Sequence, residues 1–372
     1  MTEDVIDEYR CVAVLSSLNC AMLTIREDRT IVLETGSDWA WAVAFHPDGK
    51  HLLGGGADGI RRWHLPDGQE VGKQTGMNLN AISVSRDGKW VVCGTTKGAS
   101  VWDAELDEEV IDVEGGNRVY AIDVSPDSTR FATGTVSEDA SIWDIASGER
   151  LVGPLKYGGH AVTGVRFSPS GEHIAASCLG GLVRIHDSRN GSQLIDIDTT
   201  TRRELAVTPL VWSNDAQRIF TASQDNRIKC FAISTGSQLA ASPILNGSDS
   251  ISLADNNKFI ATVASDAISF LDASTLAKVG TAIEGEWSSG ISLHHSRIAA
   301  GRRDGKIIIH GLPNFLPDLY GPFRVSNCLF IMLACRITTI SCIRHRPRRN
   351  DQPMRNLWPP VATTINHLAL NQ

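Results

Sequence analysis

Two landmarks recur along most of this chain at intervals of 39 to 45 residues. The first ends a short segment with apolar residues at alternating positions, a pattern typical of β-strands. It falls at Trp63, Trp102, Trp143, His186, Phe231, Leu271 and His310. The second is an apolar residue just before a tight turn, at Phe45, Val84, Val124, Phe167, Trp212, Leu253 and Leu293. Two landmarks that keep step over seven units indicate a repeat architecture built from strands, such as a propeller.

The best-preserved units resemble the WD40 repeat family. The resemblance rests on Trp102-Asp103, Trp143-Asp144, Gly159-His160 and turns of the Ser-Pro-Asp type, and it covers roughly residues 30–311. It implies an all-β fold, a seven-bladed β-propeller of four-stranded antiparallel blades around a channel. Trp-Asp occurs in only two units and Gly-His in one, so the chain is identified as a degenerate member. An eighth, partial blade from residues 10–25 is the alternative.

Ring closure is predicted from the two ends of the repeat region. The last unit has an inner strand at residues 306–310, but Pro313 and Pro317 stand where its outer strand should follow, and proline disfavours a paired strand. Residues 30–34, which precede the first unit, have the sequence of an outer strand. We therefore predict that residues 30–34 pair with residues 306–310, which would remove exposed sheet edges.

This closure divides the chain into three expected parts. Residues 1–29 form an N-terminal extension, residues 30–320 form the propeller, and residues 321–372 form a tail. The tail lacks the repeat and is expected to be unstructured. Arg336 interrupts its apolar run, and an uninterrupted span of about 20 apolar residues is needed to cross a bilayer.

Charge and cysteine use restrict the expected partners and compartment. The formal net charge is −7, with −13 on residues 1–320 and +6 on the tail. An acidic propeller argues against general nucleic-acid binding, which requires a basic face. Cys93, Cys178 and Cys230 fall in expected strands, where a free thiol acts as a small buried hydrophobe. With an acidic start that lacks a leader pattern, this predicts a cytoplasmic protein. The basic run at residues 344–349 leaves a nuclear address or a contact with an anionic surface as alternatives.

Catalytic and metal-binding arrangements are not predicted from the sequence. His294-His295 has no carboxylate or cysteine at ligand spacing, so a packed or solvated pair is favoured over a metal site. Gly54-Gly55-Gly56 is not followed by a helix, which disfavours a phosphate cradle. The resemblance assigns His160 a structural hydrogen bond. We therefore expect no enzyme activity, no cofactor, no metal and no small-molecule substrate.

A partner-binding site is predicted where the innermost strands begin. Six and four residues before the turn landmark, the units carry aromatic and polar side chains that should surround one mouth of the channel. In propellers related to this chain, that face commonly holds partner peptides. Tryptophan, tyrosine and arginine are the residues that most often anchor interfaces. The predicted site comprises Trp39, Trp41, Trp287, Arg118 and Tyr120, with the tryptophans gathered where the last unit adjoins the first. The alternative for Trp41 is packing between blades, because it shares the parity of Val43 and Phe45.

The expected function is that of a non-enzymatic interaction platform that binds a protein or peptide partner, without nucleic acid or membrane. One alternative is a substrate receptor of a cullin-type ubiquitin ligase, because residues 174–177 and 183–189 resemble the signature of that group. His186 departs from that signature, which has tryptophan or tyrosine there. An enzyme with an active site at the channel mouth is the alternative of another class, and it would require histidines and carboxylates that converge on one face.

Overall fold

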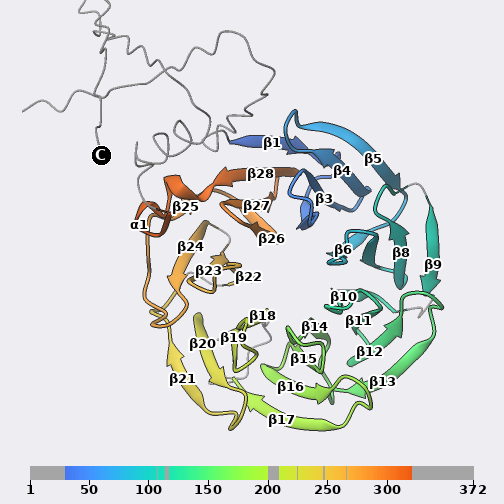
Figure 1. The fold of residues 1–372 in the computed structure, drawn as a ribbon, viewed down its shortest axis with the longest axis vertical. Coiled ribbons are helices and arrows are strands. Elements are labelled where there is room, and N and C mark those ends of the chain that lie inside the picture. Colours follow the sequence, from blue (N-terminus) through green and yellow to red (C-terminus); the bar gives the residue numbers. More distant parts are fainter. Residues whose placement is uncertain are drawn as a thin grey trace, which may run out of the picture. The chain divides into compact units, whose positions relative to one another are not determined.

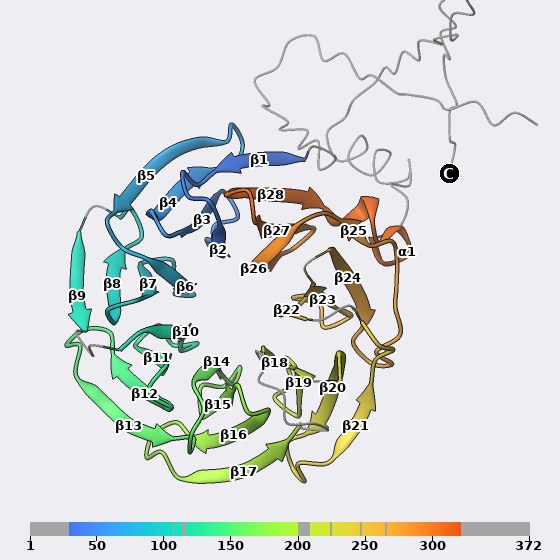
Figure 2. The same ribbon diagram turned by 180° about the vertical axis from the view of Figure 1, so that it is seen from behind.

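The computed structural model describes residues 30–320 apart from positions 107, 114–116, 200–208, 224, 246–247 and 265. These residues form seven four-stranded antiparallel sheets arranged as blades in a ring (Figure 1). The same ring is seen from behind in Figure 2. The predicted seven-bladed propeller is confirmed. The predictions for the N-terminal extension, for a partial blade at residues 10–25 and for the tail lie outside the described residues.

Each of the first six blades uses four consecutive strands, from the innermost to the outermost. Blade one comprises β2 (Ala40–Phe45), β3 (His51–Gly56), β4 (Gly59–His64) and β5 (Gln69–Thr75), and blade two comprises β6 (Leu79–Val84), β7 (Trp90–Thr95), β8 (Ala99–Asp103) and β9 (Glu109–Val113). Blade three comprises β10 (Val119–Val124), β11 (Arg130–Thr135), β12 (Asp139–Asp144) and β13 (Arg150–Lys156), and blade four comprises β14 (Val162–Phe167), β15 (His173–Cys178), β16 (Leu182–Asp187) and β17 (Gln193–Asp198). Blade five comprises β18 (Leu210–Trp212), β19 (Arg218–Ser223), β20 (Arg227–Ala232) and β21 (Gln238–Ala241), and blade six comprises β22 (Ser250–Leu253), β23 (Phe259–Val263), β24 (Ala267–Asp272) and β25 (Ile283–Glu284).

Blade seven joins the two ends of the described chain. Its inner strands are β26 (Trp287–His294), β27 (Arg297–Arg302) and β28 (Lys306–Gly311), and its outer strand is β1 (Ile31–Glu34). The register runs from Ile31 opposite Ile309 to Glu34 opposite Lys306. The predicted closure is therefore confirmed, and Figure 1 shows β1 lying along β28. After β28 the chain forms a 3₁₀ turn, η1 (Leu312–Asn314), and one helical turn, α1 (Pro317–Tyr320).

The hydrophobic core is divided into seven clusters, each between two adjacent blades. The second strand of each blade is apolar on both faces because both faces pack on neighbours. Phe131, Phe220 and Phe259 in three of these strands have no solvent exposure. Cys93, Cys178 and Cys230 are buried free thiols within the described propeller, as predicted.

The turns after the innermost strands repeat one hydrogen-bond pattern. In three blades a serine hydroxyl donates to an aspartate two residues later: Ser85 to Asp87 at 2.6 Å, Ser125 to Asp127 at 2.5 Å, and Ser213 to Asp215. The same aspartates accept backbone N–H groups of the turn. These bonds favour the charged carboxylate, so the pKa of each aspartate lies below its ordinary value despite partial burial.

Adjacent innermost strands are also joined by hydrogen bonds. The Ser83 hydroxyl accepts the Val124 N–H at 3.2 Å, and the Asp123 carboxylate accepts the Phe167 N–H at 2.8 Å. Ser292 of blade seven accepts the Phe45 N–H at 3.2 Å. These bonds hold the innermost strands of blades one, two, three, four and seven in fixed places around the channel. Within the described part of the chain, no helix has the length and apolar character needed to cross a membrane.

Candidate partner-binding surface at the channel mouth

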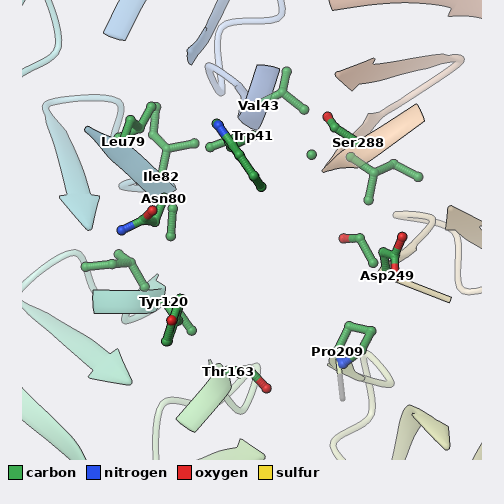
Figure 3. A pocket seen from close by; sticks show the side chains of 18 of the residues that line it. Trp41, Val43, Leu79, Asn80, Ile82, Tyr120, Thr163, Pro209, Asp249 and Ser288 are labelled. Atoms are coloured by element: carbon green, nitrogen blue, oxygen red, sulfur yellow. The ribbon is translucent and has the colours of Figure 1, made fainter. Parts of the chain in front are cut away.

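A cavity of about 700 Å³ lies at the centre of the ring, where the innermost strands begin. Its rim carries a side chain from each of several blades: Trp41 of β2, Asn80 of β6, Tyr120 of β10, Thr163 of β14, and Asp249 just before β22. Figure 3 shows these side chains around the central space. They are the residues found four positions before the turn landmark, so the predicted ring at the channel mouth is present. Thr208, which has the same position in unit five, lies outside the described residues.

A β-bulge directs these side chains into the channel. In each of blades one to four the innermost strand carries one residue more than its partner, between residues 40 and 42, 79 and 81, 119 and 121, and 162 and 164. The extra residues are Trp41, Asn80, Tyr120 and Thr163. A bulge breaks the alternation of a strand and re-aims the bulged side chain. The alternative that Trp41 packs between blades is therefore wrong, and 42% of Trp41 is exposed.

Trp39 and Trp41 form one aromatic surface on blade one. Their ring centroids lie 5.1 Å apart, and their planes differ by 17°, so the indoles are stacked. Trp39 is 38% exposed. Single exposed apolar side chains are common, but a contiguous exposed apolar patch is typical of an interaction site. Together the two indoles offer a flat apolar face to a molecule that enters the mouth.

Arg303 completes this surface from blade seven. It lies in the turn between β27 and β28, and its guanidinium carbon is 5.3 Å from the centroid of the Trp39 ring. Its Nε donates to the Trp287 carbonyl at 3.1 Å. The carboxyl of Asp249 is open to the channel but partly desolvated by the surrounding blades, which raises its pKa, while the charge of Arg303 opposes that rise.

Arg118 and Tyr120 lie farther round the rim, on blade three. The Arg118 guanidinium carbon is 6.0 Å from the centroid of the Tyr120 ring. Both residues line the cavity. A guanidinium binds an acidic or polar group, and the aromatic ring beside it binds an apolar group. The two together therefore suit a ligand that carries both kinds of group. Four of the five predicted site residues therefore lie at the mouth.

Trp287, the fifth predicted residue, does not reach the mouth. It is 1% exposed, packs in the cluster between blades six and seven, and donates from its indole nitrogen to the Ile283 carbonyl at 3.2 Å. The prediction that Trp287 contacts a partner is wrong. The cause is a wider bulge in β26, where three residues separate the paired residues Trp287 and Ile291. Two residues separate the equivalent pair of β2, Ala40 and Val43. Trp287 thus has the same buried position in blade seven that Ala40 has in blade one.

Arg303 is the rim residue that sequence reasoning missed. It lies in Arg302-Arg303-Asp304-Gly305, a hairpin turn with two arginines, whereas blade one has Asp58-Gly59 at this place. Two adjacent arginines in this hairpin turn are the sequence feature that would have identified Arg303 as a rim residue. Among the described residues that line the cavity, Asp249 is the one carboxylate, and none is histidine or cysteine.

Three segments of the chain match the family described as "WD domain, G-beta repeat", at residues 27–60, 109–144 and 153–187. The chain carries WD40 repeats. The matched segments include the best-preserved Trp-Asp unit, where the Trp143 indole donates to the Thr133 hydroxyl at 2.9 Å. The remaining blades complete the propeller with landmarks that depart from the repeat, such as His310 in place of tryptophan.

Curated relatives share the repeats over part of their length. The chain is 33% identical over 119 residues to a protein named chromatin assembly factor 1 subunit FAS2 homolog from Oryza sativa subsp. japonica, covering 29% of this chain and 24% of the relative. It is 24% identical over 217 residues to the angio-associated migratory cell protein of Homo sapiens, covering 56% of this chain and 49% of the relative. The chain thus spans half or less of the length of these relatives.

Among solved structures, the chain resembles the β-propeller domain of Cps50 (Swd1) from Myceliophteria thermophila. The TM-score is 0.65 at 19% sequence identity, over 76% of this chain and 99% of that domain. This likeness supports the fold.

Proposed function

We propose that this WD40 propeller is a protein-interaction scaffold that binds an extended peptide segment of a partner at the channel mouth. The observation that carries the proposal is the exposed, stacked Trp39–Trp41 pair at the rim of the central cavity. WD40 relatives support a general role in protein interaction. The choice of this face rests on the side chains that surround it.

The chemistry of the rim selects a peptide with an apolar or aromatic anchor beside an acidic group. The anchor would pack on the Trp39–Trp41 face, where aromatic contacts are worth about 0.5–1.5 kcal/mol beyond the area they bury. Two arginines at the rim, Arg118 and Arg303, face the single carboxylate of Asp249, while Arg166, deeper in the cavity, lies 4.0 Å from the Asp123 carboxylate. The mouth is therefore locally basic on a body whose first 320 residues carry −13. An acidic group would be attracted to the mouth and repelled elsewhere.

The test is a peptide-display selection on the intact protein, followed by affinity measurements for the selected peptides. Truncation of a residue that anchors an interface costs about 2 kcal/mol or more, roughly a thirtyfold loss of affinity. We expect that loss in Trp39→Ala and in Trp41→Ala. The matched control is Leu194→Ala with Leu239→Ala, because these leucines are as exposed but lie on the outer strands β17 and β21.

Two outcomes would reject the proposal. The first is peptide affinity that survives both tryptophan substitutions while circular dichroism shows folded protein. The second is equal loss in the outer-strand control. The ubiquitin-ligase alternative stays a prediction; residues 183–187 of its segment lie in β16 of blade four. The expected cytoplasmic location also stays a prediction.

A further inference from the structure

The turn between β2 and β3 differs in chemistry from the equivalent turns of the other blades. It lies at the end of β2 opposite the channel mouth, because Trp39 precedes that strand and His46 follows it. Blades two, three and five place a serine hydroxyl against the turn aspartate. Blade one has His46 in place of that serine, and a second histidine, His51, begins β3. Asp48 remains as the turn aspartate.

These three side chains converge. The His46 Nδ1 is 3.1 Å from Asp48 Oδ1, and the His51 Nδ1 is 2.7 Å from Asp48 Oδ2. One nitrogen or oxygen atom from each of the three lies within 4.8 Å of the other two. His46 is 9% exposed, and 32% of the Asp48 side chain is open to solvent. The group is thus held by the fold and reachable from one side.

Hydrogen bonds determine which His46 nitrogen has a lone pair. Its Nε2 lies 2.9 Å from the Gly88 carbonyl of blade two, and a carbonyl oxygen can only accept, so Nε2 carries the proton. The Asp48 backbone N–H points at Nδ1 from 3.3 Å, which also makes Nδ1 an acceptor. In the neutral imidazole Nδ1 is therefore the nitrogen with the lone pair, and it faces the carboxylate oxygen of Asp48 at 3.1 Å. A metal ion between these two atoms would take the place of the proton that joins them in the imidazolium form.

We propose that His46 Nδ1, the Asp48 carboxylate and His51 Nδ1 bind one divalent transition-metal ion of the zinc class. Neutral imidazole nitrogens and a carboxylate oxygen are the donors such ions take from proteins, and three protein ligands leave a position open for water or a partner's group. The Nε2 bond from His46 to Gly88 is the kind of outer contact that orients a ligating histidine. Binding would release to solvent the proton that His51 shares with Asp48. The bound ion would tie the β2–β3 turn to blade two.

The test is titration of the full chain with Zn²⁺ alone, followed by calorimetry, with Asp48→Asn and His51→Ala as the test variants. Asparagine suits this turn, because Asn256 has the same place in blade six and accepts the Lys258 N–H at 3.0 Å. The matched control is His173→Ala. His173 begins β15 as His51 begins β3, but its turn holds Ser168 and Ser170, whose hydroxyls lie 3.1 Å apart.

We expect the wild type and His173→Ala to bind the ion equally, and both test variants to bind it at least about tenfold more weakly. Zn²⁺ should also raise the melting temperature of the wild type more than that of the test variants. Cobalt substitution separates this site from the cysteines of the chain, because thiolate ligands add a charge-transfer band that nitrogen and oxygen ligands lack. Equal affinity in all four proteins, or a cobalt spectrum of thiolate type that the test variants leave unchanged, would overturn the proposal. A melting temperature that rises at low pH and does not change with Zn²⁺ would also overturn the proposal. It would show that a proton, and not a metal ion, joins His46 to Asp48.

Discussion

Blades one and seven carry tryptophans at the same count before the turn landmark, yet the structure gives them opposite environments. Trp39 and Trp41 of blade one lie stacked and exposed at the channel mouth. Trp287 of blade seven is buried in the cluster between blades six and seven, which also contains Phe259 and Phe270. The difference follows from one additional bulged residue in β26 relative to β2. A change of one position moves a side chain from one face of a strand to the other.

This difference implies that the two blades use tryptophan for different purposes. Trp287 has in blade seven the buried position that Ala40 has in blade one, and Arg303 of blade seven lies over the Trp39 ring. Blade seven thus contributes a buried tryptophan to the core and the Arg303 cation to the mouth. Blade one contributes the aromatic face of the mouth. Substitutions in the two blades should accordingly separate stability from binding.

The largest effect is expected at the seam that closes the ring. Leu33 of β1 is 2% exposed and packs in the cluster shared by blades one and seven, whereas its neighbour Val32 points outward and is 51% exposed. Leu33→Asp places a charge in that core and should cost at least about 4 kcal/mol of stability. Val32→Asp should be nearly neutral. Thermal unfolding and size-exclusion chromatography measure both; similar melting temperatures and monomer content would show that β1 does not hold the ring closed.

Trp287→Ala should have the next largest effect, a loss of about 3–5 kcal/mol, because it removes a fully buried aromatic side chain. Trp39→Ala should cost less than about 1 kcal/mol, because that indole is exposed. Urea unfolding of both variants measures the difference. Equal free energies of unfolding would mean that the two tryptophans share one environment and that the comparison between blades is wrong.

Much of the fold followed from the sequence because each blade repeats the same two landmarks. The apolar residue before the turn and the strand-end residue fixed seven units, and the prolines after β28 indicated closure by residues 30–34. The candidate site was predicted by counting back from Phe45, Val124 and Leu293. That count succeeds where the bulges are alike, as for Trp41 and Tyr120. It fails for Trp287, because the size of a bulge depends on how two blades meet, and neither landmark records that contact.

The histidine cluster of blade one is a second feature that the repeat pattern does not predict. His46 and His51 lie five residues apart, and this spacing does not distinguish them from the other histidines of the chain. Their meeting depends on the turn at Asp48, whose carboxylate accepts the Lys50 N–H at 2.7 Å and the His51 N–H at 3.1 Å. The repeat pattern predicts a turn at this place, but not that both imidazoles fold toward its carboxylate.

Arg303→Ala should have a smaller effect, confined to the mouth. The guanidinium over Trp39 contributes about 0.5–1 kcal/mol at an exposed site, so peptide affinity should fall severalfold and stability should hardly change. Quenching of tryptophan fluorescence by acrylamide should increase as the Trp39 ring loses its cover. Arg302→Ala is the matched control, because Arg302 lies over the buried ring of Trp287 at 5.8 Å. If both variants weaken peptide binding equally, the effect belongs to net charge rather than to the contact with Trp39.

The smallest predicted effect distinguishes the two blades by pH. At the strand-end landmark blade one has Trp63, which is buried, and blade seven has His310. The His310 ring lies edge-on to Trp287 and to Phe315, with centroids 6.3 and 5.4 Å apart. This apolar contact desolvates the imidazole and lowers its pKa below the ordinary value of 6.5.

The lowered pKa fixes the direction of the pH effect. The folded protein binds a proton at His310 less readily than the unfolded chain does, so stability falls as pH drops through 6.5 towards the folded pKa. His310→Phe should keep the ring packing and remove this part of the slope, while His186 and His294, whose pKa values are also lowered, retain the rest. Urea unfolding at about pH 7.5 and about pH 5.5 measures the change across the range in which histidine titrates. A slope that is unchanged in His310→Phe would mean that His310 remains hydrated, and that blade seven does not pack its landmark residue as blade one packs Trp63.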